Sequence, residues 1–335
     1  MSSFKRYLFY HLKSRIGYTL TASLLGFLIT LFSLIDEHDG NVDELTESLF
    51  FWPAIILSIY AILSAILEFT PFLNRRNLDT LYAMPIKRST MQLVHYLSGL
   101  FSTLFCHAAS FFLVLFFWLP YHNFFSLGYA IPLYFISVVC GFIMYAISVF
   151  LFTIGNTAID GCITLLFGGF SLPLILVTLR KFINYRKIFG FSPTEVSFFW
   201  SPINAFTYAY QIKIEKRYSY SLASFYQSKS TLFMIILFLV IGIATTVGFF
   251  LLHPKKRIET VGECTHSLFS YRTLVPLYAL CCITMMSRVN IFTYSLIFVC
   301  MTVGYIIYRR TYRLKKSDLI VMGSIVLYSL ITAFF

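Results

Sequence analysis

A charged island between two long apolar runs holds the residues of this chain with the clearest chemical potential. From Glu68 it reads Glu-Phe-Thr-Pro-Phe-Leu-Asn-Arg-Arg-Asn-Leu-Asp-Thr-Leu-Tyr-Ala-Met-Pro-Ile-Lys-Arg. Its four cations are Arg75, Arg76, Lys87 and Arg88. Between them Leu78, Leu81 and Tyr82 share one face of a predicted helix at i, i+3 and i+4 spacing. A short helix with one apolar and one charged face suits contact with another protein, so we expect a cytoplasmic docking element.

Outside the charged island, the cysteines, histidines and carboxylates are not spaced as they are in catalytic, metal-binding or cofactor-binding motifs. No G-x-x-x-x-G-K-[ST] sequence occurs, so we expect no phosphate loop. The seven cysteines include no C-x-x-C pair and are interpreted as small buried hydrophobes. His95 and His107 lie about 120° apart around an ideal helix, too far for one ion, and the acidic loop 36–48 lacks a calcium-binding spacing. We expect no catalytic residue, no metal and no cofactor on this chain.

Ionisable residues deep in an apolar run would indicate a proton or ion path, because burying them in hydrocarbon is costly. Glu68 and Asp160 come closest, and both lie at the ends of apolar runs. We interpret Glu68 as a capped helix end and Asp160 as part of a turn. This pattern disfavours a proton-coupled transporter and an intramembrane protease.

Composition sets the class of protein that must position these residues. Hydrophobic residues make up 58% of the chain and charged residues 12%, which is too little polar surface to coat a soluble domain. The net charge of +12 would suit a nucleic-acid partner, but the Lys and Arg residues gather between apolar runs. Membrane orientation explains that distribution better, so we expect an all-α polytopic membrane protein and no nucleic acid.

Nine apolar runs have the length or hydrophobicity expected of membrane-spanning helices, since a bilayer core needs about 20 residues. They are 17–35, 49–68, 93–119, 129–155, 161–179, 231–252, 273–286, 291–308 and 319–335. The seventh run is short, and eight spans are the alternative to nine. No cleavable signal peptide is expected, because the first run is full length and lacks a small-residue cleavage site.

The distribution of charges predicts the orientation. Four cations precede the first run, whereas the loop 36–48 has six carboxylates and no Lys or Arg, so we expect a cytoplasmic N-terminus. Alternation then places the charged island and the loops 253–272 and 309–316 inside. One segment opposes this assignment, because 180–230 holds eight cations and is expected outside. Long loops translocate largely regardless of charge, which lessens the conflict.

The first sixteen residues have an amphipathic pattern of their own. Phe4, Leu8, Leu12 and Ile16 cover about 120° of a helix, as in a helix lying on the inner leaflet. Lys5 and Arg15 interrupt the apolar arc. The alternative is an ordinary basic flank of the first span.

Two motifs carry a resemblance to a known family. The island, ending in Met84-Pro85-Ile86-Lys87-Arg88, is similar to the segment after the second span of permease subunits of type 2 ABC exporters, with Met for the usual Leu and Lys for the usual Ser. The later sequence Lys-Lys-Arg-Ile-Glu-Thr-Val-Gly resembles an Arg-x-x-Glu-x-Ala-Gly stretch of a subgroup with extra C-terminal spans, although Val261 replaces Ala. The likeness covers about the first 260 residues in span order.

The resemblance implies a six-helix permease core, pairing with an identical or homologous permease chain, and two separate ATPase subunits that bind ATP and Mg. In the family this region, with the N-terminal helix, meets the ATPase. The ATPase-coupling residues so implied are Glu68, Arg75, Arg76, Asn77, Leu78, Asp79, Leu81, Met84, Pro85, Ile86, Lys87 and Arg88.

The expected organisation follows from the spans and the resemblance together. Residues 1–16 form an interfacial amphipathic helix, and 17–252 form the six-span core, with the coupling element at 69–90 and a long outer segment at 180–230. Residues 253–335 add a cytoplasmic linker and three further spans.

The expected function is the permease of an ATP-driven exporter in a bacterial cell membrane, in contact with lipids. The expected cargo is a peptide, drug-like or envelope-related amphipathic molecule. A membrane-embedded lipid-modifying enzyme and a non-pumping antimicrobial sensor or immunity protein are the alternatives. Cations of the outer segment are expected to attract an anionic ligand or lipid headgroups, with a solvated loop as the alternative. These cations are Arg186, Lys187, Lys216 and Arg217.

Overall fold

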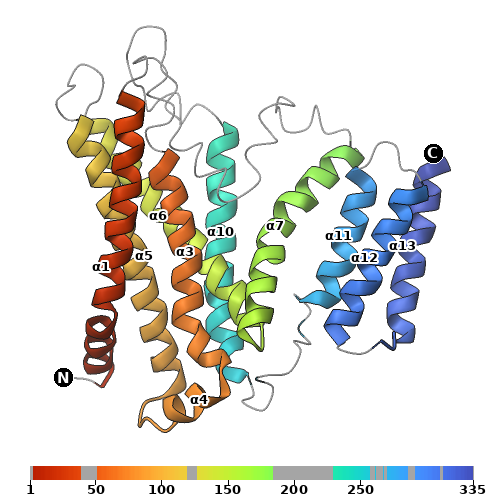
Figure 1. The fold of residues 1–335 in the computed structure, drawn as a ribbon, viewed down its shortest axis with the longest axis horizontal. Helices are drawn as coiled ribbons and strands as arrows, with labels where there is room; N and C mark the ends of the chain where they lie inside the picture. Colours follow the sequence, from red (N-terminus) through yellow and green to blue (C-terminus); the bar gives the residue numbers. More distant parts are fainter. Residues whose placement is uncertain are drawn as a thin grey trace. The chain divides into compact units, whose positions relative to one another are not determined.

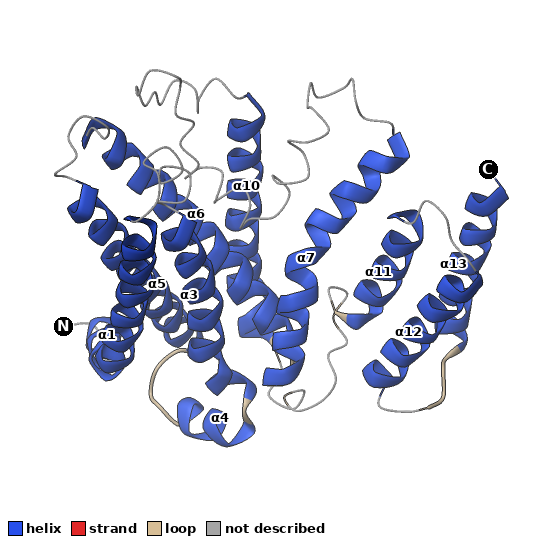
Figure 2. Ribbon diagram, turned by 45° about the horizontal axis from the view of Figure 1, so that its top comes forward, coloured by secondary structure: helices blue, strands red, loops and turns tan. Residues whose placement is uncertain are grey.

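The computed structural model is helical throughout the part of the chain that it describes, which confirms the all-α class. The described residues are 3–38, 51–118, 127–183, 229–256, 261, 267, 270–285, 291–309 and 312–334. Figures 1 and 2 show helices and no strand in these ranges. The long helices are α1 (Ser3–His38), α3 (Phe51–Phe69), α5 (Arg88–Trp118), α6 (Leu127–Ile154), α7 (Ala158–Ile183), α10 (Lys229–Leu252), α11 (Tyr271–Met285), α12 (Ile291–Arg309) and α13 (Lys316–Phe334).

Each of the nine predicted apolar runs overlaps one of these helices. Four helices are long and apolar enough to cross a membrane, judged by length and composition over the described residues. These four segments are Phe4–Phe32, Pro53–Leu73, Arg88–Phe116 and Tyr134–Ile154. Shorter apolar stretches lie in α7, α10, α11 and α12. The six-span core and the full count of nine remain predictions.

The N-terminal helix is longer than one span. α1 runs from Ser3 to His38, so the first sixteen residues continue directly into the first apolar run. At about 1.5 Å per residue, 36 residues extend about 54 Å, compared with about 30 Å for a bilayer core. One end of α1 must therefore project beyond hydrocarbon if the helix crosses a membrane.

The chain divides into two compact units. The first comprises Met1–Phe72, Arg76–Phe150 and Ser201–Lys256, and the second comprises Leu73–Arg75, Leu151–Trp200 and Arg257–Phe335. The first unit therefore holds α1, α3, α5, most of α6, and α10. The second holds α7 together with the three C-terminal helices, whereas the sequence-based division placed α7 in the six-span core.

In the first unit, α5 packs against both α1 and α3, and small or hydroxylated residues line the contacts. Thr19 of α1 lies 3.0 Å from Ser102 of α5, hydroxyl to hydroxyl. Ser64 of α3 donates a hydrogen bond to the carbonyl oxygen of Gly99 at 2.8 Å. A methyl group on Gly99 would lie 2.3 Å from the Tyr145 hydroxyl, so glycine is what allows this close approach.

Aromatic and imidazole rings pack together in the first unit where α10 ends. His253, in the 3₁₀ helix η2 (His253–Lys255), lies 5.2 Å from Phe249 and 5.9 Å from Phe72, ring centre to ring centre. The amide nitrogen of Gln92 lies 2.7 Å from its Nδ1. Burial, with a smaller contribution from Lys256, lowers the pKa of His253 to about 3, so the ring is neutral at neutral pH.

In the second unit, α7 begins at a tight turn. The Thr157 hydroxyl accepts a hydrogen bond from the backbone N–H of Asp160 at 3.1 Å, as a helix N-cap does. The Asp160 carboxylate is buried and accepts a hydrogen bond from Tyr271 of α11 at 3.1 Å. Tyr278 donates a second bond from α11 to the Phe167 carbonyl at 2.6 Å. These contacts join α7 to the C-terminal helices.

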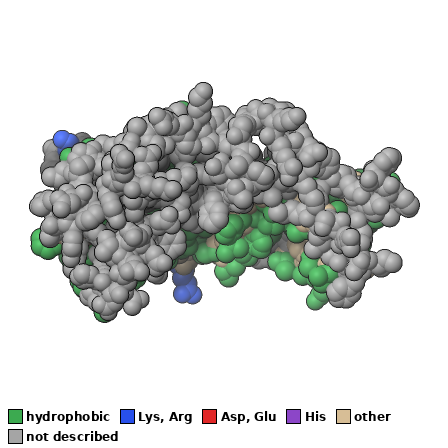
Figure 3. Space-filling view, turned by 90° about the horizontal axis from the view of Figure 1, so that it is seen from above, with side chains coloured by type: hydrophobic (Ala, Val, Ile, Leu, Met, Phe, Trp, Pro, Cys, Tyr) green, Lys and Arg blue, Asp and Glu red, His purple; other side chains and the backbone are tan. Residues whose placement is uncertain are grey.

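The outward faces of the long helices are apolar. Large hydrophobic side chains stand exposed along α1, α5 and α6, including Phe32 (67% exposed), Phe116 (73%) and Phe135 (64%). Most described side chains visible in Figure 3 are likewise hydrophobic, shown in green. Such faces suit a lipid solvent rather than water.

Candidate functional site

The charged island contains a short helix, α4 (Arg75–Tyr82), which follows the 3₁₀ helix η1 (Thr70–Leu73). Figure 1 labels α4 between α3 and α5 along the chain. Leu78 is only 1% exposed, and Leu81 and Tyr82 are half-buried. The predicted apolar face of this helix is therefore confirmed. Burying one apolar side holds a helix of eight residues that would not persist alone in water.

A compact turn leads from α4 into α5. The backbone N–H of Ala83 bonds to the carbonyl of Asp79 at 3.2 Å, and that of Met84 bonds to Leu81 at 3.3 Å. Pro85 then breaks the helical pattern, because proline has no N–H to donate. The guanidinium of Arg88 lies 4.3 Å from the centre of the Tyr82 ring, a cation–π contact that closes the turn.

The twelve residues predicted to couple to an ATPase differ in exposure. Eight are exposed on the surface: Arg75, Arg76, Asn77, Asp79, Met84, Pro85, Lys87 and Arg88. Leu81 and Ile86 are half-buried, and Glu68 and Leu78 are buried. Arg75 also donates a hydrogen bond from Nε to the carbonyl oxygen of Val261 at 2.6 Å. The exposed residues form a surface, and the buried ones support it.

The outer cationic residues Arg186, Lys187, Lys216 and Arg217 lie outside the described residues. Residues 39–48 of the acidic loop also lie outside them.

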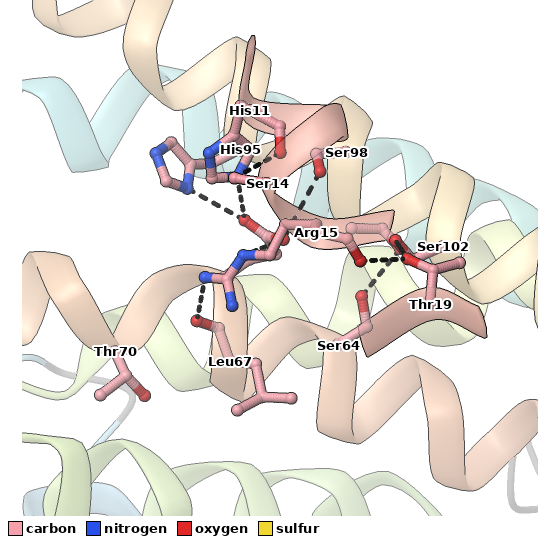
Figure 4. A network of polar contacts seen from close by, with 12 residues as sticks. His11, Ser14, Arg15, Thr19, Ser64, Leu67, Thr70, His95, Ser98 and Ser102 are labelled. Carbon is pink, nitrogen blue, oxygen red and sulfur yellow. Dashed lines mark hydrogen bonds and ion pairs between the residues drawn. The ribbon is translucent and has the colours of Figure 1, made fainter. Parts of the chain in front are cut away.

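A buried polar cluster lies where α1, α3 and α5 meet. Glu68, in the last turn of α3, accepts two hydrogen bonds on one oxygen, Oε2. One comes from His11 Nε2 of α1 at 2.8 Å, and the other from His95 Nδ1 of α5 at 3.0 Å. Figure 4 shows the side chains of His11 and Arg15, both from α1, converging with that of His95 from α5. Their exposed fractions confirm the burial, with His11 at 8%, Glu68 at 4% and His95 at 3%.

Further groups complete the cluster around Glu68. Arg15 Nε lies 3.5 Å from the other carboxylate oxygen, Oε1, and Ser98 donates a hydrogen bond to the same oxygen at 3.5 Å. The Tyr7 hydroxyl lies 3.1 Å from His95 Nε2. The two imidazole rings are 4.1 Å apart, centre to centre.

These contacts fix where the protons lie. An ionised carboxylate only accepts hydrogen bonds, so His11 Nε2 and His95 Nδ1 must each carry a proton. The second nitrogen of a neutral His95 then accepts from the Tyr7 hydroxyl. Hydrogen bonds to a charged acceptor are about twice as strong as neutral ones, so the cluster fastens three helices next to the charged island.

The sequence pattern alone did not indicate this cluster. The expectation that His95 holds no metal ion concerned its pairing with His107, and His107 is buried elsewhere on α5 with its Nε2 2.7 Å from the Ser137 hydroxyl of α6. Glu68 was expected to be a helix end, whereas its side chain bonds to two other helices. The available signal was position, because His11, Glu68 and His95 each lie at or near the end of an apolar run that is expected to face the cytoplasm.

Comparisons with known proteins give no match: no family model, no curated protein and no solved structure resembles the chain.

Proposed function

We propose that this chain is the membrane-spanning permease subunit of a type 2 ABC exporter, of the subgroup with extra C-terminal spans. The observation that carries the proposal is α4, a short helix between two long apolar helices with its apolar face buried and its charged face exposed. A helix of this kind is a ready contact for a soluble partner, and its sequence resembles the element that such permeases present to their ATPases.

The surroundings of α4 suit the transmission of force. α4 is joined to α3 by the single turn η1 and to α5 by the short turn through Pro85. The cluster of His11, Glu68 and His95 then fastens α1, α3 and α5 together within the same unit. A partner that displaces α4 therefore moves three helices rather than one, and Glu68 acts as a positioning residue.

The other subunits of the proposed transporter are separate chains. Two ATPase subunits supply ATP, Mg and the phosphate loops, since this sequence has no such loop. A second permease chain, identical or homologous, completes the pathway in the cell membrane. The cargo class is a peptide, drug-like or envelope-related amphipathic molecule, moved outward.

The proposal is tested with the intact complex in inside-out membrane vesicles. The double variant Asp79→Asn/Arg88→Gln removes one exposed carboxylate and the cation that stacks on Tyr82. ATP-dependent uptake of a labelled amphipathic cationic peptide should fall about tenfold, equivalent to about 1.4 kcal/mol, while ATP hydrolysis continues.

Arg313→Gln is the matched control, because Arg313 is an exposed cation that lies outside the charged island in the sequence. Equal uptake in the double variant and the control would count against coupling through α4. Catalytic turnover of a lipid by the purified chain alone would favour the enzyme alternative.

A further inference from the structure

We propose that His11, Glu68 and His95 form a binding site for one divalent transition-metal ion, with Zn²⁺ as the best fit. Among the described residues, one ligand atom from each of these three side chains lies within 4.8 Å of the others. The inference rests on this cluster alone and does not require the transport proposal.

The donor set selects the class of ion. Two imidazole nitrogens and one carboxylate oxygen suit Zn²⁺ and neighbouring first-row ions, whereas Mg²⁺ and Ca²⁺ prefer oxygen ligands throughout. Three protein ligands leave a fourth tetrahedral position for water. The His11 side chain is 11% exposed, which gives the ion and that water a route in from solvent.

Moderate shifts of the side chains would bring the three ligand atoms to the spacing of a metal site. Ligand atoms around a tetrahedral Zn²⁺ stand about 3.3 Å apart, given Zn–N bonds of about 2.0 Å. The two nitrogen-to-oxygen distances at Glu68, 2.8 and 3.0 Å, must lengthen by about half an ångström or less, and the two nitrogens, which lie within 4.8 Å of each other, must approach to about 3.3 Å. Each of the three helices contributes one ligand, so side-chain rotation and small shifts between helices supply these changes.

The imidazole protons can move to other ring nitrogens when the ion binds, so that each ring keeps its hydrogen. When the ion binds His11 Nε2 and His95 Nδ1, each ring proton moves to the ring's other nitrogen, and both imidazoles stay neutral. His95 Nε2 then donates to the Tyr7 hydroxyl, which lies 3.1 Å away. An outer hydrogen bond of this kind fixes the orientation of metal-bound histidines.

One charged group opposes the ion. Arg15 lies 3.5 Å from Glu68 Oε1, but its side chain is 27% exposed. Its flexible stem lets the guanidinium turn toward water when the ion arrives. Ser98 remains to hold Oε1 by its hydroxyl.

The test uses the full chain in detergent, purified without a histidine tag, stripped with chelator and titrated with ZnCl₂ or CoCl₂. We expect one ion per chain by elemental analysis and the visible absorption of tetrahedral Co²⁺. His95→Gln should weaken binding at least about 100-fold, and Tyr7→Phe about tenfold or more, as the loss of outer hydrogen bonds does elsewhere. His107→Gln, the same change at another buried histidine of α5, should bind as the wild type does.

If His95→Gln is poorly folded, the melting temperatures of the other variants with and without Zn²⁺ still test the proposal. Zn²⁺ should raise the melting temperature of the wild type and of His107→Gln, and should raise that of Tyr7→Phe only at higher concentration. Wild-type chain that retains no ion, or equal binding by Tyr7→Phe, His95→Gln and His107→Gln, would overturn the proposal.

Discussion

At the scale of single residues, Glu68 is the shared partner of the buried polar cluster in the first unit. Its two carboxylate oxygens receive contacts from His11, Arg15, His95 and Ser98, which come from two other helices. A buried carboxylate is tolerated only where such contacts replace its hydration. The stability of this unit therefore depends on the cluster as a set rather than on one ion pair.

Replacing Glu68 with Ala should lower the free energy of unfolding by about 3 kcal/mol, because two buried histidine N–H groups lose a charged acceptor. Thermal melting of the purified chain in detergent, followed by intrinsic fluorescence, measures the change. Asp79→Asn, at an exposed carboxylate, should leave the melting temperature nearly unchanged. Equal melting of the two variants would contradict the role given to Glu68.

The position of Glu68 was predictable from sequence, but its partners were not. It was expected at the end of the second apolar run, and it lies in the last turn of α3. His11 and His95 stand 57 and 27 residues away along the chain. Which faces of α1 and α5 meet α3 depends on packing between helices, and the local spacing of these residues does not specify it.

At the scale of elements, local pattern was more informative. Leu78, Leu81 and Tyr82 formed the apolar face that their spacing indicated, and each of the nine apolar runs overlaps a helix of the described residues. The end of the interfacial helix was harder to predict, since residues 3–38 form one continuous helix that Gly17, the first residue of the apolar run, does not interrupt. Close contacts at glycines also depend on the partner helix.

Gly99→Ala should destabilise the first unit by about 1 to 3 kcal/mol through overpacking. The new methyl would lie 2.3 Å from the Tyr145 hydroxyl and 2.9 Å from that of Ser64. Gly17→Ala is the matched control on α1, where nothing lies within 4 Å, and should stabilise by up to about 1 kcal/mol. Melting temperatures that move in the same direction for both variants would be inconsistent with tight packing at Gly99.

Leu78→Ala should loosen α4, because it removes the most deeply buried side chain of that helix, at a cost of about 2 to 5 kcal/mol. Trypsin cleavage after Arg75 and Arg76 measures the effect, since both are exposed and cleavage requires local unfolding. We expect cleavage to be at least about tenfold faster. Leu81→Ala, at a half-buried position, should give a smaller increase, and a reversed order would refute the assigned burial.

At the scale of the whole molecule, the sequence predicted the helical class and the approximate positions of the helices, and the division into a six-span core and three further spans remains a prediction. α7 belongs to the unit of the C-terminal helices because Tyr271 and Tyr278 bond to it. The order of the apolar runs along the sequence does not indicate that α7 packs against α11. The number of crossings and the orientation are still predictions from charge.

Orientation is tested by cysteine labelling in intact cells, after replacement of the native cysteines. A single cysteine at the exposed position of Ser89 should react with membrane-impermeant maleimide only after the cells are opened, because the charged island is expected inside. A cysteine at Asp43, in the acidic loop, should react from outside. Labelling of position 89 in intact cells would reverse the predicted topology.

Co-purification tests the central claim most directly. The tagged chain is extracted from its native membranes in mild detergent, and its partners are identified and counted by mass spectrometry. The exporter proposal predicts an ATPase with a phosphate loop at one copy per permease chain, and a strong reduction when Arg76→Glu and Asp79→Lys reverse the charges of α4. A chain that purifies with no ATPase, or one that keeps its ATPase fully after these charges are reversed, would contradict the claim that α4 is the contact for a separate motor.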